Sequence, residues 1–336
     1  MEIIDLLNEL RESIPLIQNT LDESFLVFLE KHLKKVYLQL EKVDQEQLEE
    51  IAASFNWNRE QLCHNFDYLT RMIIKSIKMF YDGKPASAYN LLKNKVLNVV
   101  LDDSGTRYFD YRPVNGMYRS TFYRIRKKES ASEFNTDDLY HIPFHKRTTI
   151  KPQRFSIQGQ PCLYLSTSIF TCWLEMDKPN LNGFYVSQYK SKEAFCFINL
   201  TIPPMFSDTL IKEKPLNAFL FLITYPLIAA SLVKVKNIND PFKPEYIIPQ
   251  LLLQFARNEK GVDGIIYSST KIVDNINSEA WNYSNVVIPV LSNKESGYCE
   301  KLRKKFDIST PFLVEDSALL IPIMSFLNNI EEKMND

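Results

Sequence analysis

The sequence predicts an α+β protein in which an all-helical part precedes a part rich in strands. Across residues 3–100, apolar side chains recur every three or four positions, which is the period of an amphipathic helix. Beyond the polar run at 101–105, short aromatic and β-branched runs indicate strands with a few helices between them. We therefore expect a helical domain at 1–105, a mixed domain at 106–300 and a strand and helix tail at 301–336 that packs on the body.

The helical part should contain about four or five helices. Asp44 and Asn58 are each followed three residues later by a glutamine, which is the spacing of a capping box and predicts a helix start. The Asp-Gly-Lys-Pro break at 82–85 should end one helix and precede the next. These signals predict helices near 59–81 and 86–100.

The second part contains five predicted strands and three predicted helices. Strands and helices do not alternate regularly, so a mixed α+β domain is favoured over a parallel sheet. The predicted strands lie at 122–126, 162–166, 195–200, 265–267 and 286–290. The predicted helices lie at 168–176, 216–232 and 249–258, and another apolar helix is expected at 318–330.

Composition and charge exclude several classes of protein. Hydrophobic residues make up 45% and charged residues 24%, which is ordinary for a globular protein. The net charge of -1 supplies no global field that would draw the chain to nucleic acid or to anionic lipid. The five cysteines are scattered and only four histidines are present, so we expect neither a metal site nor a disulfide framework.

Three further features predict a cytoplasmic protein. The first residues lack the basic region and cleavage site of a secretion signal. The most apolar stretch, 218–233, is shorter than the roughly 20 residues that span a bilayer, so we expect it to be a buried core segment. The absence of a disulfide pattern is typical of a reducing compartment.

Three separate segments carry polar residues that suggest a site. The first is Tyr-Arg-Ile-Arg at 123–126, which contains Arg124. The second begins at Arg154, continues through Gly-Gln-Pro-Cys-Leu-Tyr-Leu-Ser and reaches Glu175. The third is Asp-Gly-Ile-Ile-Tyr-Ser-Ser, which ends at Ser269.

In this order, the segments resemble the RES-domain family, which is named for its arginine, glutamate and serine. The family's central motif, Arg-Trp-Asn-Pro-x-Gly-x-Pro-x-Leu-Tyr-Leu-Ser with a later glutamate, aligns without a gap over 154–175, although its Trp-Asn-Pro is Phe-Ser-Ile here. The resemblance spans roughly 118–290. It implies a fold similar to ADP-ribosyltransferases, with two small sheets flanking a cleft for NAD. It also implies a toxin that acts as an NAD glycohydrolase, an NAD phosphorylase or an ADP-ribosyltransferase.

The residues suit that chemistry. Breaking the nicotinamide–ribose bond leaves positive charge on the ribose, which a carboxylate beneath the ring stabilises, and Glu175 is the candidate. Nicotinamide leaves as a neutral molecule and needs no second acid. Arg124 and Arg154 would bind the pyrophosphate. These three are the predicted catalytic residues, with NAD as the substrate and no metal.

An aromatic side chain should stack on the nicotinamide ring. Tyr164 and Phe155 are the first candidates. The family commonly has Tyr-Gly-Gly before the second arginine, whereas this chain has Lys-Pro-Gln at 151–153. Tyr123 and Tyr140 therefore also remain candidates.

Hydroxyl and imidazole side chains complete the candidate set. Ser269, or its neighbour Ser268, would hold a phosphate or ribose oxygen, and Asn285 falls where the family commonly has an asparagine. His141 and His145 lie four residues apart without a third metal ligand, so we expect them to be surface or loop histidines.

Two other functions stay open. Arg59 and His64 have the Arg-x4-His spacing of HEPN-type ribonucleases, which act as dimers, although helical geometry places the two side chains about 140° apart. The other alternative is a RES-like module that binds a partner and has lost activity. An active enzyme would need restraint, so we expect an inhibitory antitoxin-like partner or autoinhibition by residues 1–105.

Overall fold

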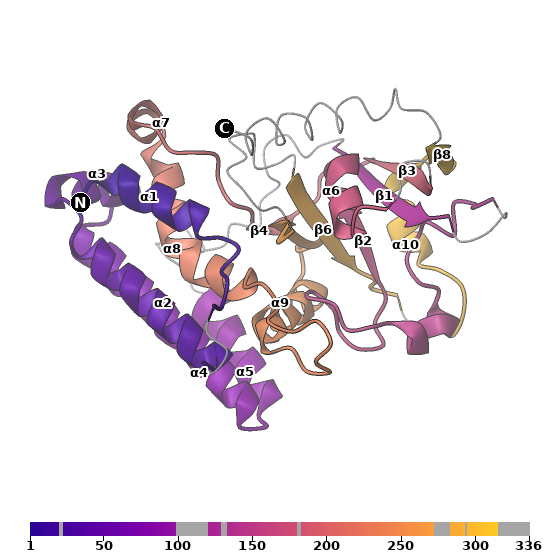
Figure 1. Ribbon diagram of the computed structural model, residues 1–336, viewed down its shortest axis with the longest axis horizontal. Coiled ribbons are helices and arrows are strands. Elements are labelled where there is room, and N and C mark those ends of the chain that lie inside the picture. Colours follow the sequence, from indigo (N-terminus) through magenta and orange to yellow (C-terminus); the bar gives the residue numbers. More distant parts are fainter. Residues whose placement is uncertain are drawn as a thin grey trace.

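The computed structural model describes residues 1–19, 23–98, 120–128, 133–179, 183–271, 283–292 and 294–314. The helix expected at 318–330 and the domain boundary expected at residue 105 lie outside these ranges. The first part is all helical and the second combines a sheet with several helices, so the α+β prediction is confirmed (Figure 1).

Five amphipathic α-helices form the first part, with a π-helical turn after the last. Asn58 caps its helix as predicted, since its side chain accepts from the Gln61 N–H and the Gln61 side chain accepts from the Asn58 N–H. Asp44 also caps a helix, but the Gln47 side chain instead accepts from the Ile3 N–H and links two helices. The elements are α1 (Ile3–Glu12), α2 (Phe25–Leu40), α3 (Gln45–Ala53), α4 (Arg59–Tyr81), α5 (Pro85–Leu92) and η1 (Lys93–Leu97).

The strands of the second part form one mixed sheet of eight strands, in the order β4-β5-β6-β2-β1-β3-β7, with β8 also paired to β3. This corrects the expectation of two separate sheets. The two halves meet at β1 and β2, which are joined through the single pair Tyr123 and Ser166. The strands are β1 (Thr121–Lys127), β2 (Cys162–Ser166), β3 (Phe184–Ser191), β4 (Phe197–Leu200), β5 (Gly264–Ser268), β6 (Ser284–Pro289), β7 (Phe306–Ile308) and β8 (Phe312–Val314).

Gly264 opens β5 at a close approach to β6. A Cβ atom at this position would lie 2.2 Å from the backbone oxygen of Val287, so only glycine fits. The Asp-Gly pair of the third sequence segment therefore has a structural reason that is independent of any ligand.

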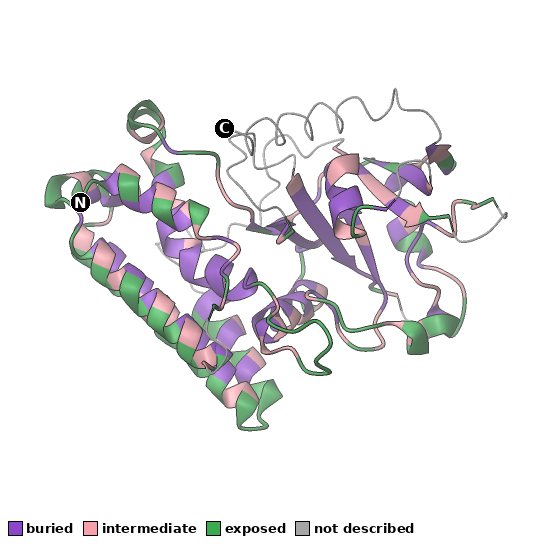
Figure 2. Ribbon diagram, in the orientation of Figure 1, coloured by how far each residue is buried: buried purple, intermediate pink, exposed green. Residues whose placement is uncertain are grey.

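The helices of the second part connect and cover these strands. The apolar stretch at 218–233 lies mostly in α8, and from Ala218 to the end of this helix most side chains are buried (Figure 2). Within the described residues, no helix is long and apolar enough to cross a membrane. The elements are η2 (Phe144–Thr149), α6 (Ile169–Glu175), α7 (Asp208–Glu213), α8 (Pro215–Ser231), η3 (Pro244–Tyr246), α9 (Ile247–Asn258) and α10 (Glu300–Arg303).

Both parts of the chain share one apolar core. Helix α8 packs against α1, α2, α3 and α4, and also against α9 and β4. The buried cluster around it runs from Ile3 in α1 to Val287 in β6. Removing the N-terminal helices would therefore expose apolar surface of α8 and not simply release a separate module.

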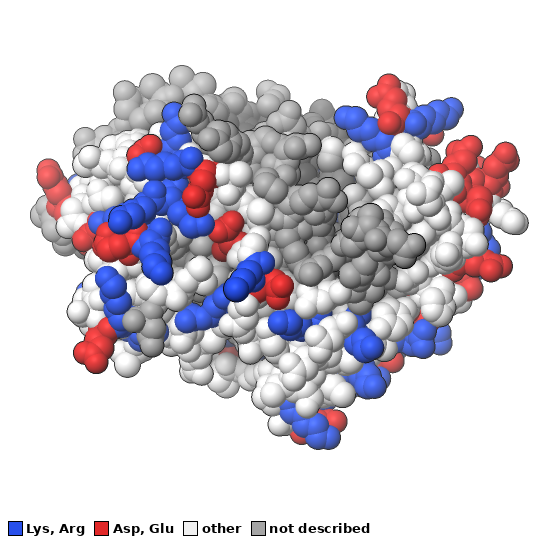
Figure 3. Space-filling view, turned by 180° about the vertical axis from the view of Figure 1, so that it is seen from behind, with Lys and Arg blue, Asp and Glu red and all other residues white. Residues whose placement is uncertain are grey.

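Charged side chains are mixed on the surface. On the face shown in Figure 3, basic groups have acidic neighbours and no large area carries a single sign. This agrees with the net charge of -1.

The two histidines at 141 and 145 have different environments. His145 is exposed, whereas His141 lies in a loop, as one of the two predicted outcomes has it, but is buried there with 1% of its surface exposed. The His141 Nε2 accepts from the Cys299 N–H at 2.9 Å, and its Nδ1 lies 2.8 Å from the Ile142 carbonyl oxygen. Nδ1 must therefore carry the proton of a neutral ring. Burial lowers the pKa of His141 to about 4.

We expect the protein to lose stability as the pH falls from about 6.5 to about 4. Burial lowers the pKa of both His141 and His32 to about 4 from an ordinary 6.5. In this window the unfolded chain binds protons that the folded chain does not, so acid favours unfolding. His141 contributes a slope of at most about 1.4 kcal/mol per pH unit.

Urea unfolding across this pH range measures the slope. His141→Gln cannot titrate and should reduce the pH dependence of the free energy of unfolding, whereas the exposed His145→Gln should leave it unchanged. Equal slopes for His141→Gln and the wild type would contradict the prediction.

Candidate active site

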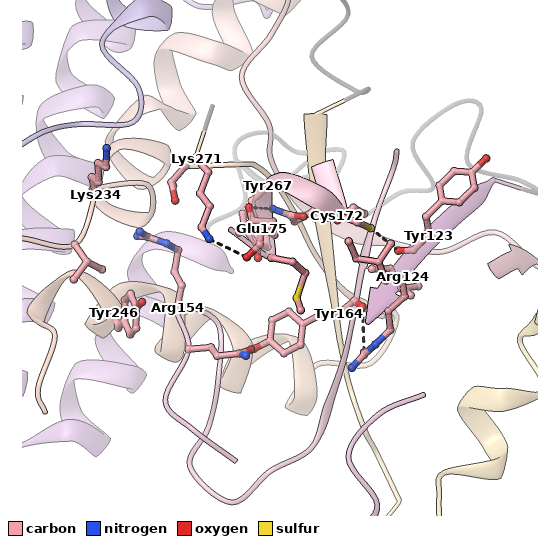
Figure 4. A pocket seen from close by; sticks show the side chains of 18 of the residues that line it. Tyr123, Arg124, Arg154, Tyr164, Cys172, Glu175, Lys234, Tyr246, Tyr267 and Lys271 are labelled. Carbon is pink, nitrogen blue, oxygen red and sulfur yellow. Dashed lines mark hydrogen bonds between the residues drawn. The ribbon is translucent and has the colours of Figure 1, made fainter. Parts of the chain in front are cut away.

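A cavity of about 610 Å³ lies where the sheet meets the segment that follows α8 (Figure 4). Its walls come from β1, β2, α6, β5, β6, the loop at 152–154, the turn at 270–271 and residues between 234 and 246. Arg124, Arg154 and Glu175 all line it, so the structure brings together the three residues predicted to be catalytic.

Glu175 is the last residue of α6. The Ser168 side chain starts this short helix by accepting from the Thr171 N–H at 3.1 Å. A carboxylate at a helix C-terminus is unfavourable, because it faces the negative end of the helix dipole. Lys271 offsets this, since its ammonium group donates to the Glu175 backbone oxygen at 2.8 Å and pairs with Asp177 at 2.6 Å.

Two neutral donors hold one oxygen of the Glu175 carboxylate. The Ser269 hydroxyl donates to Oε1 at 2.7 Å, and the Asn285 side-chain N–H donates to the same atom at 2.6 Å. The Ser166 hydroxyl donates to the Asn285 oxygen at 2.6 Å, which sets the orientation of that amide. Within the described part of the chain, Oε2 has no hydrogen-bond partner and is available to a ligand.

The two arginines bring positive charge to the cavity. Arg124 donates to the Tyr164 backbone oxygen at 3.2 Å, and Arg154 donates to the Ser231 backbone oxygen at 3.0 Å. Neither guanidinium forms an ion pair with any described residue. Burial lowers the pKa of both groups, because the low-dielectric surroundings penalise the charged form. An anionic ligand would relieve that penalty.

The aromatic candidates separate into two groups. Tyr123 and Tyr164 line the cavity, and burial raises the pKa of Tyr164 well above its ordinary value, so its hydroxyl stays neutral. Phe155 is fully buried and packs on Tyr267 at 4.4 Å between ring centroids. Tyr140 is 2% exposed, and its hydroxyl donates a hydrogen bond to the Cys299 backbone oxygen. Phe155 and Tyr140 are thus core residues and cannot stack on a ligand in this conformation.

Strand alternation distinguishes the two serines. Successive side chains of a strand point to opposite faces, so Tyr267 and Ser269 share one face and Ser268 points to the other. Ser269 reaches Glu175, whereas the Ser268 hydroxyl accepts from the Ile202 N–H at 2.9 Å. Ser268 is therefore placed away from the cavity.

Arg59 and His64 lie in the helical part and do not line this cavity. The Arg59 guanidinium donates to the Glu41 backbone oxygen at 2.8 Å, and His64 is exposed. The described residues also contain no cluster of three or more His, Cys, Asp or Glu side chains that could hold a metal ion.

Sequence reasoning missed several polar residues of the cavity, among them Lys234, Tyr246 and Lys271. Lys271 could have been found from its place next to a motif, since it lies in the turn two residues after Ser269. Lys234 and Tyr246 follow α8 and belong to no motif, so no local signal marks them. The Tyr246 ring lies 5.4 Å from the Arg154 guanidinium, a cation–π distance.

Residues 121–289, half of the chain, match the RES domain family. A protein of Bacillus subtilis (strain 168), described as "Putative toxin YopC", is 33% identical over 271 residues, which cover 75% of this chain and 61% of that protein. The chain thus corresponds to about three fifths of that relative. No solved structure is significantly similar to the chain. The matched range contains the arginines, Glu175 and Ser269, and the chain therefore belongs to the RES-domain family.

Proposed function

We propose that the chain is a toxin-like enzyme that cleaves NAD at the bond between nicotinamide and ribose. One observation carries the proposal: the Glu175 carboxylate faces a cavity whose two arginines have no ion-pair partner among the described residues. The word toxin in the name of the Bacillus relative adds support.

The carboxylate matches the charge that the reaction develops. As the bond to nicotinamide breaks, positive charge accumulates on the ribose ring, and a nearby carboxylate stabilises that state more than the ground state. Ser269 and Asn285 are neutral donors, so they orient Glu175 without cancelling its charge. Nicotinamide departs as a neutral molecule, which explains how one carboxylate suffices where ordinary glycosidases need two.

The positive charges of the two arginines match the negative charges of the NAD pyrophosphate. A pyrophosphate carries two negative charges and accepts paired hydrogen bonds, which guanidinium groups donate well. Arg124 and Arg154 use one donor each on a backbone oxygen, so further donors remain for phosphate oxygens. NAD combines a cationic ring with an anionic bridge, and the cavity presents one carboxylate and two guanidinium groups.

Glu175→Gln should lower the rate of nicotinamide release by about 10³-fold or more, because the amide keeps the shape but removes the negative charge. NAD binding should persist. The matched control is Glu213→Gln, an exposed carboxylate on α7, which should leave the rate unchanged. Release of nicotinamide, measured by chromatography, decides between the outcomes.

Unchanged turnover in Glu175→Gln would refute the assigned role. Binding of NAD by the wild type without any turnover would instead identify a catalytically silent module. In an active preparation, free ADP-ribose, a phosphorylated ADP-ribose or labelled protein would identify water, phosphate or a side chain as the acceptor.

The two adjacent serines provide a second, matched comparison. Ser269→Ala should lower kcat by about 10–100-fold, because Glu175 loses one of the two donors to Oε1. Ser268→Ala should leave kcat unchanged and lower the free energy of unfolding by about 1 kcal/mol, because the Ile202 N–H loses its acceptor. Steady-state kinetics and thermal unfolding of both variants test this. An equal fall of kcat in both would contradict it.

A further inference from the structure

The segment from α8 to η3 forms one wall of the cavity. Lys234, Val235 and Ile238 line it from this segment, and Tyr246 lines it from the end of η3. Figure 4 shows Lys234, Tyr246 and Arg154 together on one side of Glu175, with Tyr123 and Arg124 on the other side. In this view Glu175 lies between these two groups of side chains.

The N-terminal part of the chain holds this wall in place through the connection between α1 and α2 and through α4. Val233 forms a bridge with Leu16, and the Lys234 N–H donates to the Leu16 backbone oxygen at 2.8 Å. Further along, the ring of Phe242 lies parallel to that of Phe80 in α4, with centroids 6.4 Å apart. The wall is thus fixed by contacts made before any ligand arrives, which reduces the entropy cost of binding.

The far end of the segment is closed by a buried carboxylate. Glu245 is 2% exposed and accepts from the Lys236 N–H at 3.1 Å. The next residue, Tyr246, places its ring beside the Arg154 guanidinium. The Arg154 guanidinium in turn donates a hydrogen bond to the backbone oxygen of Ser231, the last residue of α8. This bond attaches Arg154 to the wall.

The chemistry of this wall differs from that at Glu175. The Lys234 side chain is exposed and forms no ion pair with a described residue, so it adds a second cation to the side of the cavity that holds Arg154. Ile238 is 70% exposed, which is unusual for an apolar side chain that lines a cavity. Two cations on one side of a cavity can bind phosphate oxygens together, and an exposed apolar rim can pack against a flat purine.

We propose that Lys234 and Ile238 form a subsite for the adenylyl half of the dinucleotide. Lys234 binds an oxygen of the adenylyl phosphate together with Arg154, and Ile238 with Val235 contacts the purine. The assignment rests on the proposed function and extends it to the half of the substrate that does not react. It also gives the N-terminal helices a part in substrate binding, because they position this wall.

The test compares NAD with nicotinamide mononucleotide, which has the scissile bond but lacks the adenylyl half. Lys234→Ala and Ile238→Asp should each raise KM for NAD by about 10-fold, leave kcat unchanged and leave kcat/KM for nicotinamide mononucleotide unchanged. The controls are Lys243→Ala, in the same segment but outside the cavity, and Leu291→Asp, an apolar residue that is 60% exposed elsewhere. Both controls should behave as wild type.

Failure of the subsite and failure of the proposed function are distinguishable. If Glu175→Gln abolishes turnover while Lys234→Ala and Ile238→Asp leave KM for NAD unchanged, the function stands and the subsite is refuted. An equal loss with both substrates also refutes it. If the wild type turns over neither substrate, calorimetry with adenosine diphosphate decides. Binding that weakens about 10-fold in Lys234→Ala supports the subsite alone, and absence of binding refutes it.

Discussion

Helix α8 is apolar on all sides, so every face of it must be covered by another part of the chain. The helices α1–α4 cover part of its surface, and α9 and β4 cover more. The segment that follows α8 forms a β-bridge with Leu16 immediately after the helix ends. The last residue of α8, Ser231, accepts a hydrogen bond from the Arg154 guanidinium through its backbone oxygen. The requirement to bury α8 thus determines where one wall of the cavity lies. It also explains how a helical part without cavity residues can influence the site.

The charges of the cavity are kept apart. The Glu175 carboxylate is held by neutral hydroxyl and amide groups, and the two arginines are held by backbone oxygens. Direct pairing of these charges would stabilise the free protein but leave less charge for a ligand. Burial of the unpaired arginines costs free energy that the shared core must supply. A ligand of opposite and separated charges would recover that cost, which is the physical basis of the proposed function.

Much of the secondary structure could be predicted, because its signals are local. The 59–81 helix and the 162–166 strand have the bounds expected from the sequence, since a capping asparagine and a short run of apolar and aromatic residues act within a few positions. Two features could not be predicted, because they depend on contacts between residues that are distant in the sequence. The environment of His141 depends on Cys299, and the joining of two sheets into one depends on a pair between β1 and β2. Both contacts link residues far apart in the chain.

The sequence by itself determined the family, the order of the polar residues and the choice of Arg124, Arg154 and Glu175, because these belong to contiguous motifs. Only the tertiary structure decided which serine faces Glu175 and which aromatic residues reach the cavity, since both depend on the face that each strand turns to the core. It alone brought Lys234 to the site. That residue follows a helix whose position is set by packing, and no pattern of neighbouring residues encodes such a position.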